Sequence, residues 1–196
     1  HWVAMFYGLS AAQGKIATQT EAHISANGIT DIRVIAESYA WFLRDYVRRE
    51  AEADILAPLG LVSSDIVRQP LAINSNVAKH LVRQMQTYYR GSGLSDDLGG
   101  AIIIGTDDIG AHVYQVEDGK VVFMDNIGFV AAGGGQWHAE SQFMFAGYTR
   151  FWGFPNALSL LYAAKKRAEV APGVGNQTDI VIVTTSPRNV IYLAYD

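Results

Sequence analysis

The chain has 196 residues, with 15 Lys and Arg against 19 Asp and Glu, and its net charge of −4 gives no overall attraction to nucleic acid or to an anionic surface. A hydrophobic fraction of 49% and a charged fraction of 17% are typical of a compact globule, which we expect to be one domain over residues 1–196. The sequence has no cysteine, which excludes disulfides, thiolate zinc sites and cysteine nucleophiles. It also has no run near the ~18 apolar residues of a membrane span. Together these features favour a cytoplasmic protein without a membrane partner.

Three strands are predicted in the first part of the chain. Residues 2–8, WVAMFYG, form a continuous apolar and aromatic run that is typical of a buried strand. In residues 15–23, KIATQTEAH, side chains alternate with period two, which predicts a strand that contains Gln19. Residues 30–36, TDIRVIA, are a third candidate strand, and Arg33 lies within it.

Two helices are predicted to follow these strands. In residues 39–55 an apolar stripe recurs at helical spacing against a charged face. Residues 56–73 are interrupted by proline and glycine and are predicted to be a loop. Residues 74–89 again show helical spacing, with Asn74 or Ser75 as the N-cap.

The second half of the chain is predicted to contain three strands, two helices and two more strands. In order, these are residues 100–107, 111–117, 120–132, 136–151, 156–171, 179–185 and 189–196. Turn residues at 109–110, 118–119 and 186–188 predict hairpins, and hairpins impose antiparallel pairing. Strand groups that alternate with helix pairs pack most economically in four layers, so the predicted fold class is α+β, an αββα sandwich with two antiparallel sheets.

Three consecutive glycines, residues 133–135, separate a predicted strand from a predicted helix. Their backbone N–H groups could form a nest for an anion. However, His138 stands where a dinucleotide fingerprint needs its third glycine, and no Gly-Lys-Ser/Thr ending of a P-loop follows. The favoured interpretation is a crowded turn without room for side chains.

The histidines give no pattern that predicts a metal site. His138 and Glu140 form a His-x-Glu pair like that of zinc deaminases, but the cysteines of such a site are absent. The remaining histidines show no ligand spacing, so we expect imidazoles with a partner or at the surface. These are His1, His23, His80 and His112. We therefore expect neither a metal nor a cofactor.

Aromatic side chains are concentrated on one predicted helix and its end, in residues 137–152. Their number exceeds what a single buried helix stripe requires. We therefore expect core packing together with a contact between subunits, in a homo-oligomer whose helix faces make much of the interface.

The ordered set of these segments resembles a known family. Residues 100–141, from GAIIIGTDDIGAHVYQVEDG to GGGQWHAES, and residues 156–183, NALSLLYAAKKRAEVAPGVGNQTDIVIV, resemble proteasome-type subunits of the N-terminal-nucleophile hydrolase superfamily. Those subunits run from a G-x-D-x-x-G-x-x-Y-x-x-D-x-x-G pattern into a Gly-rich turn, here 133–135. They close with a Gly-rich loop before a final strand, here 172–175. Upstream, KIATQTEAH is similar to their second strand, SANGITDI to the segment after it, and YAWFLRDYVRREAEA to their first helix.

The resemblance implies the αββα fold and hydrolysis of peptide bonds by an N-terminal threonine, whose own α-amine accepts the hydroxyl proton. In such a site a lysine lowers the pKa of the nucleophile, an aspartate on the second strand orients this lysine, and the Gly-rich turn offers an N–H to the oxyanion. The matching positions here are Gln19 for the aspartate and Ile32, or Arg33 with a one-residue slip, for the lysine. The serine and aspartate that support the nucleophile are matched by Gly134 and Ala171.

These departures from the family pattern divide the functional expectation in two. An amide cannot supply the charge of a carboxylate, and an arginine cannot exchange protons near neutral pH. We therefore expect a catalytically degenerate proteasome-like subunit that builds a ring or shell. The alternative is an active threonine peptidase whose nucleophile directly precedes His1, with a peptide as substrate; the resemblance leaves open whether an ATPase partner feeds it.

Overall fold

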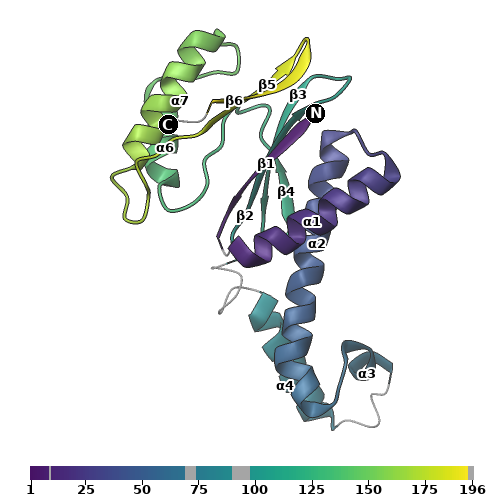
Figure 1. Ribbon diagram of the computed structural model, residues 1–196. Coiled ribbons are helices and arrows are strands. Elements are labelled where there is room, and N and C mark those ends of the chain that lie inside the picture. The colour runs from purple at the N-terminus through teal and green to yellow at the C-terminus, as the bar shows by residue number, and fades with distance from the viewer. Residues whose placement is uncertain (9, 69–73, 90–97, 194–196) are drawn as a thin grey trace.

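The computed structural model combines helices with two antiparallel sheets and describes residues 1–8, 10–68, 74–89 and 98–193 (Figure 1). Its elements, in chain order, are β1 (Trp2–Tyr7), α1 (Ser10–Asn27), α2 (Ile32–Ala51), a π-helical turn (Glu52–Leu56), a 3-10 turn (Ala57–Leu59), α3 (Ser63–Arg68), α4 (Ser75–Tyr89), β2 (Gly100–Thr106), β3 (Ala111–Glu117), β4 (Lys120–Phe123), α6 (Gln136–Phe145), α7 (Phe154–Ala168), β5 (Ile180–Thr185) and β6 (Arg188–Leu193).

The larger sheet has the strand order β1-β2-β3-β4, and each neighbouring pair is antiparallel. The β3–β4 hairpin turns at Asp118 and Gly119, whose φ angles of 51° and 67° are the left-handed values that a tight two-residue hairpin favours. The smaller sheet is the β5–β6 hairpin, and β5 contacts β2. The expectation of an α+β protein with two antiparallel sheets is therefore confirmed, together with the predicted hairpins.

β4 is much shorter than the strand predicted over 120–132. After Phe123, the facing strand β3 bonds to the side chain of Asp125 instead of to a further backbone carbonyl of β4. The Val113 N–H on β3 donates to Asp125 Oδ1 at 2.6 Å. The Val113 carbonyl accepts from the Met124 N–H at 3.0 Å. With both backbone groups of Val113 occupied in this way, the chain leaves the sheet after Phe123 and continues as an irregular segment to α6.

The prediction of a strand over residues 15–23 is wrong, since this stretch lies within α1. The buried side chains of α1 recur every four residues: Ala12, Ile16, Thr20 and Ile24. This spacing of four residues extends over the whole helix, whereas the period-two alternation is short. The helical spacing therefore determines which face of α1 is buried. The Thr20 hydroxyl donates to the Ile16 carbonyl at 2.8 Å, which satisfies a polar group on the buried helix face.

The strand predicted over residues 30–36 is also wrong, because α2 begins there. Asp31 is the N-cap residue of α2, and its Oδ1 accepts from the N–H groups of Arg33 at 2.8 Å and Val34 at 3.2 Å. An aspartate in this position satisfies N–H groups that the first helical turn leaves unpaired. The predicted helix over 39–55 is therefore the continuation of a longer one.

The other predicted helices and strands hold with shifted ends, but the loop predicted over 56–73 is wrong in part. α3 lies within the predicted loop over 56–73, of which residues 69–73 are outside the described part. α6 stops at Phe145, before the predicted end at 151, and Gly147 follows with a left-handed φ of 64°. The last strand is described to Leu193. Among the described residues, no helix has the length and apolar character needed to cross a membrane.

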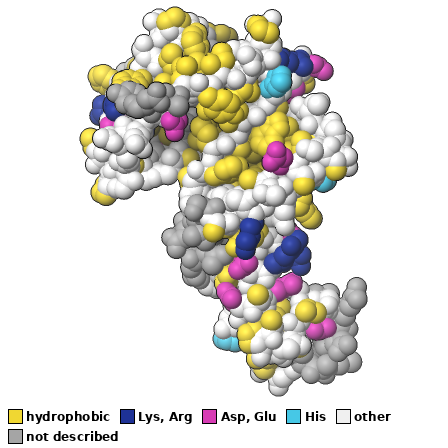
Figure 2. Space-filling model, viewed as in Figure 1, with side chains coloured by type: hydrophobic (Ala, Val, Ile, Leu, Met, Phe, Trp, Pro, Cys, Tyr) yellow, Lys and Arg dark blue, Asp and Glu magenta, His cyan; other side chains and the backbone are white. Residues whose placement is uncertain are grey.

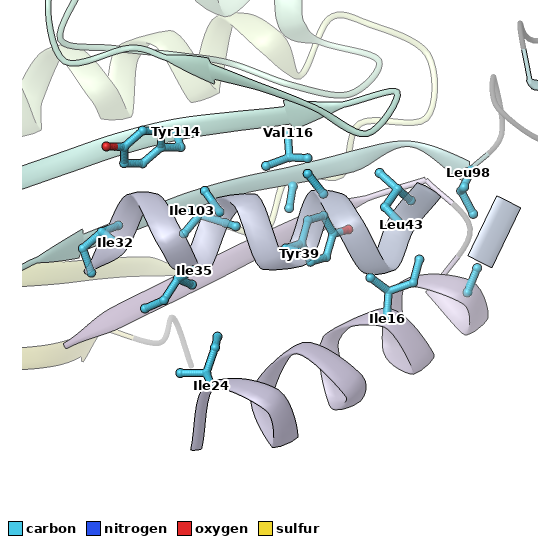
Figure 3. Packing of buried hydrophobic residues seen from close by; sticks show 14 of the residues in the cluster. Ile16, Ile24, Ile32, Ile35, Tyr39, Leu43, Leu98, Ile103, Tyr114 and Val116 are labelled. Atoms are coloured by element: carbon cyan, nitrogen blue, oxygen red, sulfur yellow. The ribbon is translucent and has the colours of Figure 1, made fainter. Parts of the chain in front are cut away.

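The main core lies where α1 and α2 cover one face of the four-stranded sheet (Figure 3). α2 packs on β2, β3 and β4, and α1 packs beside α2 and contacts β1. The labelled core side chains in Figure 3 are Ile16, Ile24, Ile32, Ile35, Tyr39, Leu43, Leu98, Ile103, Tyr114 and Val116. A second, smaller cluster joins α6 and α7, with Phe143, Leu160 and Ala164 buried and Phe129 stacked on Phe143 at 4.5 Å between ring centroids.

A buried amide connects these helices to the sheet. Gln13 on α1 is 2% exposed, and its Nε2 donates to the carbonyls of Leu98 at 2.6 Å and Tyr7 at 3.4 Å. Its Oε1 accepts the hydroxyl proton of Tyr39 on α2. Burial raises the pKa of Tyr39, which keeps this hydroxyl protonated as a donor.

Replacing Gln13 by leucine should destabilise the protein. Gln13→Leu leaves two buried carbonyls and the Tyr39 hydroxyl without this partner, and we expect the free energy of unfolding to fall by about 2–5 kcal/mol. Urea denaturation followed by circular dichroism measures the change. Gln19→Leu, on the exposed face of the same helix, is the matched control and should change stability by less than about 0.5 kcal/mol. Equal effects of the two substitutions would show that the Gln13 contacts contribute nothing specific.

Candidate functional site

Three segments that are distant in sequence meet at the end of β1, and we call this place the glycine junction. It consists of Tyr7 and Gly8, residues 133–135, and residues 171–174. A Cβ built on Gly133 would lie 4.0 Å from Tyr7 Cβ, and one built on Gly134 would lie 3.7 Å from the Pro172 carbonyl oxygen. The two Gly-rich segments singled out by the resemblance are therefore neighbours in the structure.

The three glycines of the turn have different reasons to be glycine. Gly133 has a φ of 86°, in the left-handed region that side chains disfavour. Gly135 is the N-cap of α6, and a Cβ there would lie 2.8 Å from Ala168 Cβ at the end of α7. Gly134 has room for a methyl group at ordinary contact distance. The interpretation as a crowded turn thus applies to Gly135 for steric reasons and to Gly133 for conformational ones.

Gln19 lies outside the glycine junction. It is exposed on α1 and lines an open groove between α1 and α2, together with Lys15 and Tyr46. The Lys15 ammonium lies 6.0 Å from the centroid of the Tyr46 ring. Because residues 15–23 form a helix, the match of this segment to the family's second strand has no structural basis.

Arg33 is also separate from the glycine junction. Its side chain is 64% exposed on the first turn of α2, and its Nε lies 3.7 Å from Glu37 Oε1. Ile32, the alternative for the same family position, is fully buried in the main core. In Figure 1, α1 and α2 lie on the other side of the four-stranded sheet from α6 and α7. The structure therefore does not bring Gln19 or Arg33 together with Gly134.

A charged cluster that the sequence did not predict lies at the other end of the sheet. His112 on β3 contacts two carboxylates: its Nδ1 lies 2.7 Å from Asp125 Oδ2, and its Nε2 lies 3.1 Å from Asp107 Oδ1. All three side chains are largely buried, at 12–14% exposure. The expectation that His112 has a partner is met, but neither carboxylate stands at a spacing from His112 that would reveal the contact in the sequence. No group in the described ranges has the composition and geometry to hold a metal ion.

The pKa values in this cluster follow from its contacts. Burial alone would raise the pKa of Asp107, but the N–H groups of Ile109 and Gly110, together with His112, hold it below its ordinary value. Burial alone would lower the pKa of His112, but its hydrogen bonds to Asp125 and Asp107 raise it above 6.5. The contacts thus favour the protonated form of His112 and the ionised form of Asp107.

Comparison with known proteins gives no assignment. No protein-family model matches the chain, and no curated protein matches it either.

Alanine substitutions at the turn separate the steric role of the glycines from a functional one. Gly135→Ala places a methyl group too close to Ala168, so we expect a loss of about 1–3 kcal/mol in the free energy of unfolding. Gly134→Ala should change it by less than about 0.5 kcal/mol, because the added methyl has room. Thermal or urea unfolding of both variants provides the measurement. A Gly134→Ala variant less stable than Gly135→Ala would contradict this account of the turn.

Proposed function

We propose that this chain is a subunit of a proteasome-like assembly of the N-terminal-nucleophile hydrolase type, that it builds a homo-oligomeric ring or shell, and that it has little or no peptidase activity. The observation that carries the proposal is the glycine junction. Residues 133–135 and 172–175 are the two Gly-rich segments of the resemblance, and the approach of Gly134 to Pro172 and of Gly135 to Val174 supports the proposal.

The order of the layers supports the same proposal. α1 and α2 cover one face of the four-stranded sheet, and β5 of the smaller sheet contacts β2. In the view of Figure 1, α6 and α7 lie on the side of the four-stranded sheet away from α1 and α2. An αββα sandwich would need helices on both sides of its strands, so this placement supports the proposal.

Weak catalysis is supported by the positions of the side chains that would have to perform it. Gln19 and Arg33 are exposed on α1 and α2, which lie across the four-stranded sheet from α6 and α7. At position 171 the side chain is a buried methyl group. Neither a carboxylate nor a titratable amine from these family positions reaches the glycine junction, and loss of one such group costs about 10²–10⁴ in rate.

The alternative of a threonine nucleophile directly before His1 is disfavoured by distance. β1 runs from Trp2 to Tyr7, and the glycine junction lies at its Tyr7 end. At ~3.3 Å per residue, His1 and Tyr7 lie roughly 20 Å apart along the strand. A nucleophile next to His1 would therefore lie far from the N–H groups proposed to stabilise its oxyanion.

The assembly is supported by an exposed aromatic surface on α6 and the segment that follows it. Trp137 is 78% exposed, Phe145 88% and Phe151 82%. Figure 2 shows hydrophobic side chains gathered over the part of the molecule that contains the two sheets, α6 and α7. An apolar surface of this kind is typical of a contact between subunits.

The mass of the protein in solution tests the assembly. Light scattering at micromolar concentration should give a multiple of the 21.4 kDa subunit mass. The double variant Phe145→Asp, Phe151→Asp should reduce this mass, because it places charges in the proposed interface. Val77→Asp, an exposed apolar site on α4, is the control and should leave it unchanged. A wild-type protein that is only monomeric would contradict the proposed assembly.

Covalent probes test the proposed lack of activity. The chain, expressed with the sequence that naturally precedes His1, should not be labelled by an epoxyketone or β-lactone and should not cleave fluorogenic peptides. An active proteasome treated in parallel serves as the positive control. Labelling of a new N-terminal residue, together with peptide hydrolysis, would establish the active threonine peptidase instead.

A further inference from the structure

The contacts that His112 can make depend on its protonation state. Both ring nitrogens face carboxylate oxygens, Asp125 Oδ2 at 2.7 Å and Asp107 Oδ1 at 3.1 Å. An ionised carboxylate only accepts hydrogen bonds, whereas a neutral imidazole has a single N–H. Only the imidazolium form can donate one proton to each of two ionised aspartates, so the geometry favours this form.

The two aspartates belong to separate segments that His112 holds together. Asp107 begins the β2–β3 turn, where its Oδ1 also accepts from the N–H groups of Ile109 at 2.8 Å and Gly110 at 3.2 Å. Asp125 follows β4, and its other oxygen accepts from the Val113 N–H. The imidazolium therefore joins the β2–β3 turn to the segment after β4.

The same turn also holds the smaller sheet. Arg188, at the start of β6, donates from Nη2 to the Asp107 carbonyl at 2.9 Å and to Asp108 Oδ1 at 2.6 Å. The β5–β6 hairpin is thus attached to the residues whose position the His112 contact fixes.

We propose that protonation of His112 controls how firmly the β2–β3 turn, and with it the β5–β6 hairpin, is held on the four-stranded sheet. A neutral imidazole keeps one N–H. Nδ1 keeps this proton, because its contact with Asp125 is the shorter one. The unprotonated Nε2 then turns a lone pair toward the Asp107 carboxylate. The turn loses this contact and is held by fewer bonds.

Other charged and titratable groups around the cluster do not replace the lost proton. Arg188 lies at the same turn, and it is already paired with Asp108 and the Asp107 carbonyl. The His1 backbone nitrogen donates to the Thr106 carbonyl at 3.4 Å. Tyr114, whose ring centroid is 6.2 Å from that of His112, has a raised pKa, because of its burial and then because of Asp125, Asp31 and Asp107, while Arg33 opposes the shift. Deprotonated His112 would therefore leave a net negative cluster.

The direction of the pH effect follows from the raised pKa of His112. A group whose pKa is higher in the folded protein than in the unfolded chain stabilises the fold fully below the unfolded value of about 6.5. This contribution is lost as the pH rises through the folded value. Each unit between the two values changes the opening equilibrium by about tenfold. The hairpin should therefore be held more firmly under mildly acidic conditions than under alkaline ones.

Hydrogen exchange tests the proposal. It is measured on the whole 196-residue chain at pH 6 and at pH 9 and is corrected for intrinsic exchange rates. These pH values bracket a raised histidine pKa, about 6.5 or above. We expect protection in residues 107–113 and 180–193 to fall several-fold to about tenfold at the higher pH. Protection in the middle of α1 should stay constant. Equal protection at both pH values in all three regions would overturn the proposal.

Variants and a direct titration make the test specific to His112. His112→Gln should remove the pH dependence at the hairpin, while His138→Gln, at an exposed position on α6, should retain it. An NMR titration of the His112 ring in the wild-type protein gives the result even if His112→Gln does not fold. A ring that titrates at or below the ordinary value for histidine would overturn the proposal, and a higher value would support it.

Discussion

The Gln13 amide is the contact on which the arrangement of the first helices depends. It bonds to the carbonyl at the end of β1, to the carbonyl of Leu98 just before β2, and to the Tyr39 hydroxyl on α2. One side chain thus fixes the chain reversal after β1, the start of β2 and the position of α2 on the sheet. The backbone at Gly8 and Gly99 approaches so closely here that a Cβ on either would collide with the facing strand. The buried amide and the two glycines therefore form a single constraint.

The glycine junction is a product of the same constraint. Because β1 ends against the start of β2, Tyr7 is held where the turn over 133–135 approaches it. On the other side of that turn, the end of α7 packs against Gly135. α7 is in turn positioned by the aromatic stack of Phe129, Phe143 and Tyr148 with α6. A site at this place is built from backbone, and its shape depends on packing at some distance from it.

Hairpins and long helices could be predicted from the sequence because their signals are local. Asp118 and Gly119 favour the left-handed angles that the structure has there. The strand prediction over 15–23 failed because a few alternating residues imitate a strand, while the burial of Ala12, Ile16, Thr20 and Ile24 becomes evident only over the whole helix. Asp31 was a helix cap within a stretch interpreted as a strand. These errors placed Gln19 and Arg33 on strands, and so made a catalytic arrangement with Gly134 look plausible.

The candidate site was predictable only where glycine itself carried the signal. Residues 133–135 and 172–175 are conspicuous in the sequence, and the structure brings the two segments together. The His112 cluster was not predictable, because Asp107 and Asp125 reach the ring only through the register of β2, β3 and β4. No periodicity or motif spacing encodes such a register-dependent contact.

The early end of β4 has a consequence for how the sheet meets other molecules. A sheet edge with free backbone groups is a template on which strands from other chains can add, and proteins commonly shorten or cover such edges. At Val113 the N–H and the carbonyl are already bonded to Asp125 and Met124. The Asp125 carboxylate thus occupies the backbone N–H that β3 would otherwise expose beyond the four residues of β4. At this point a strand from another chain has no free backbone groups to pair with.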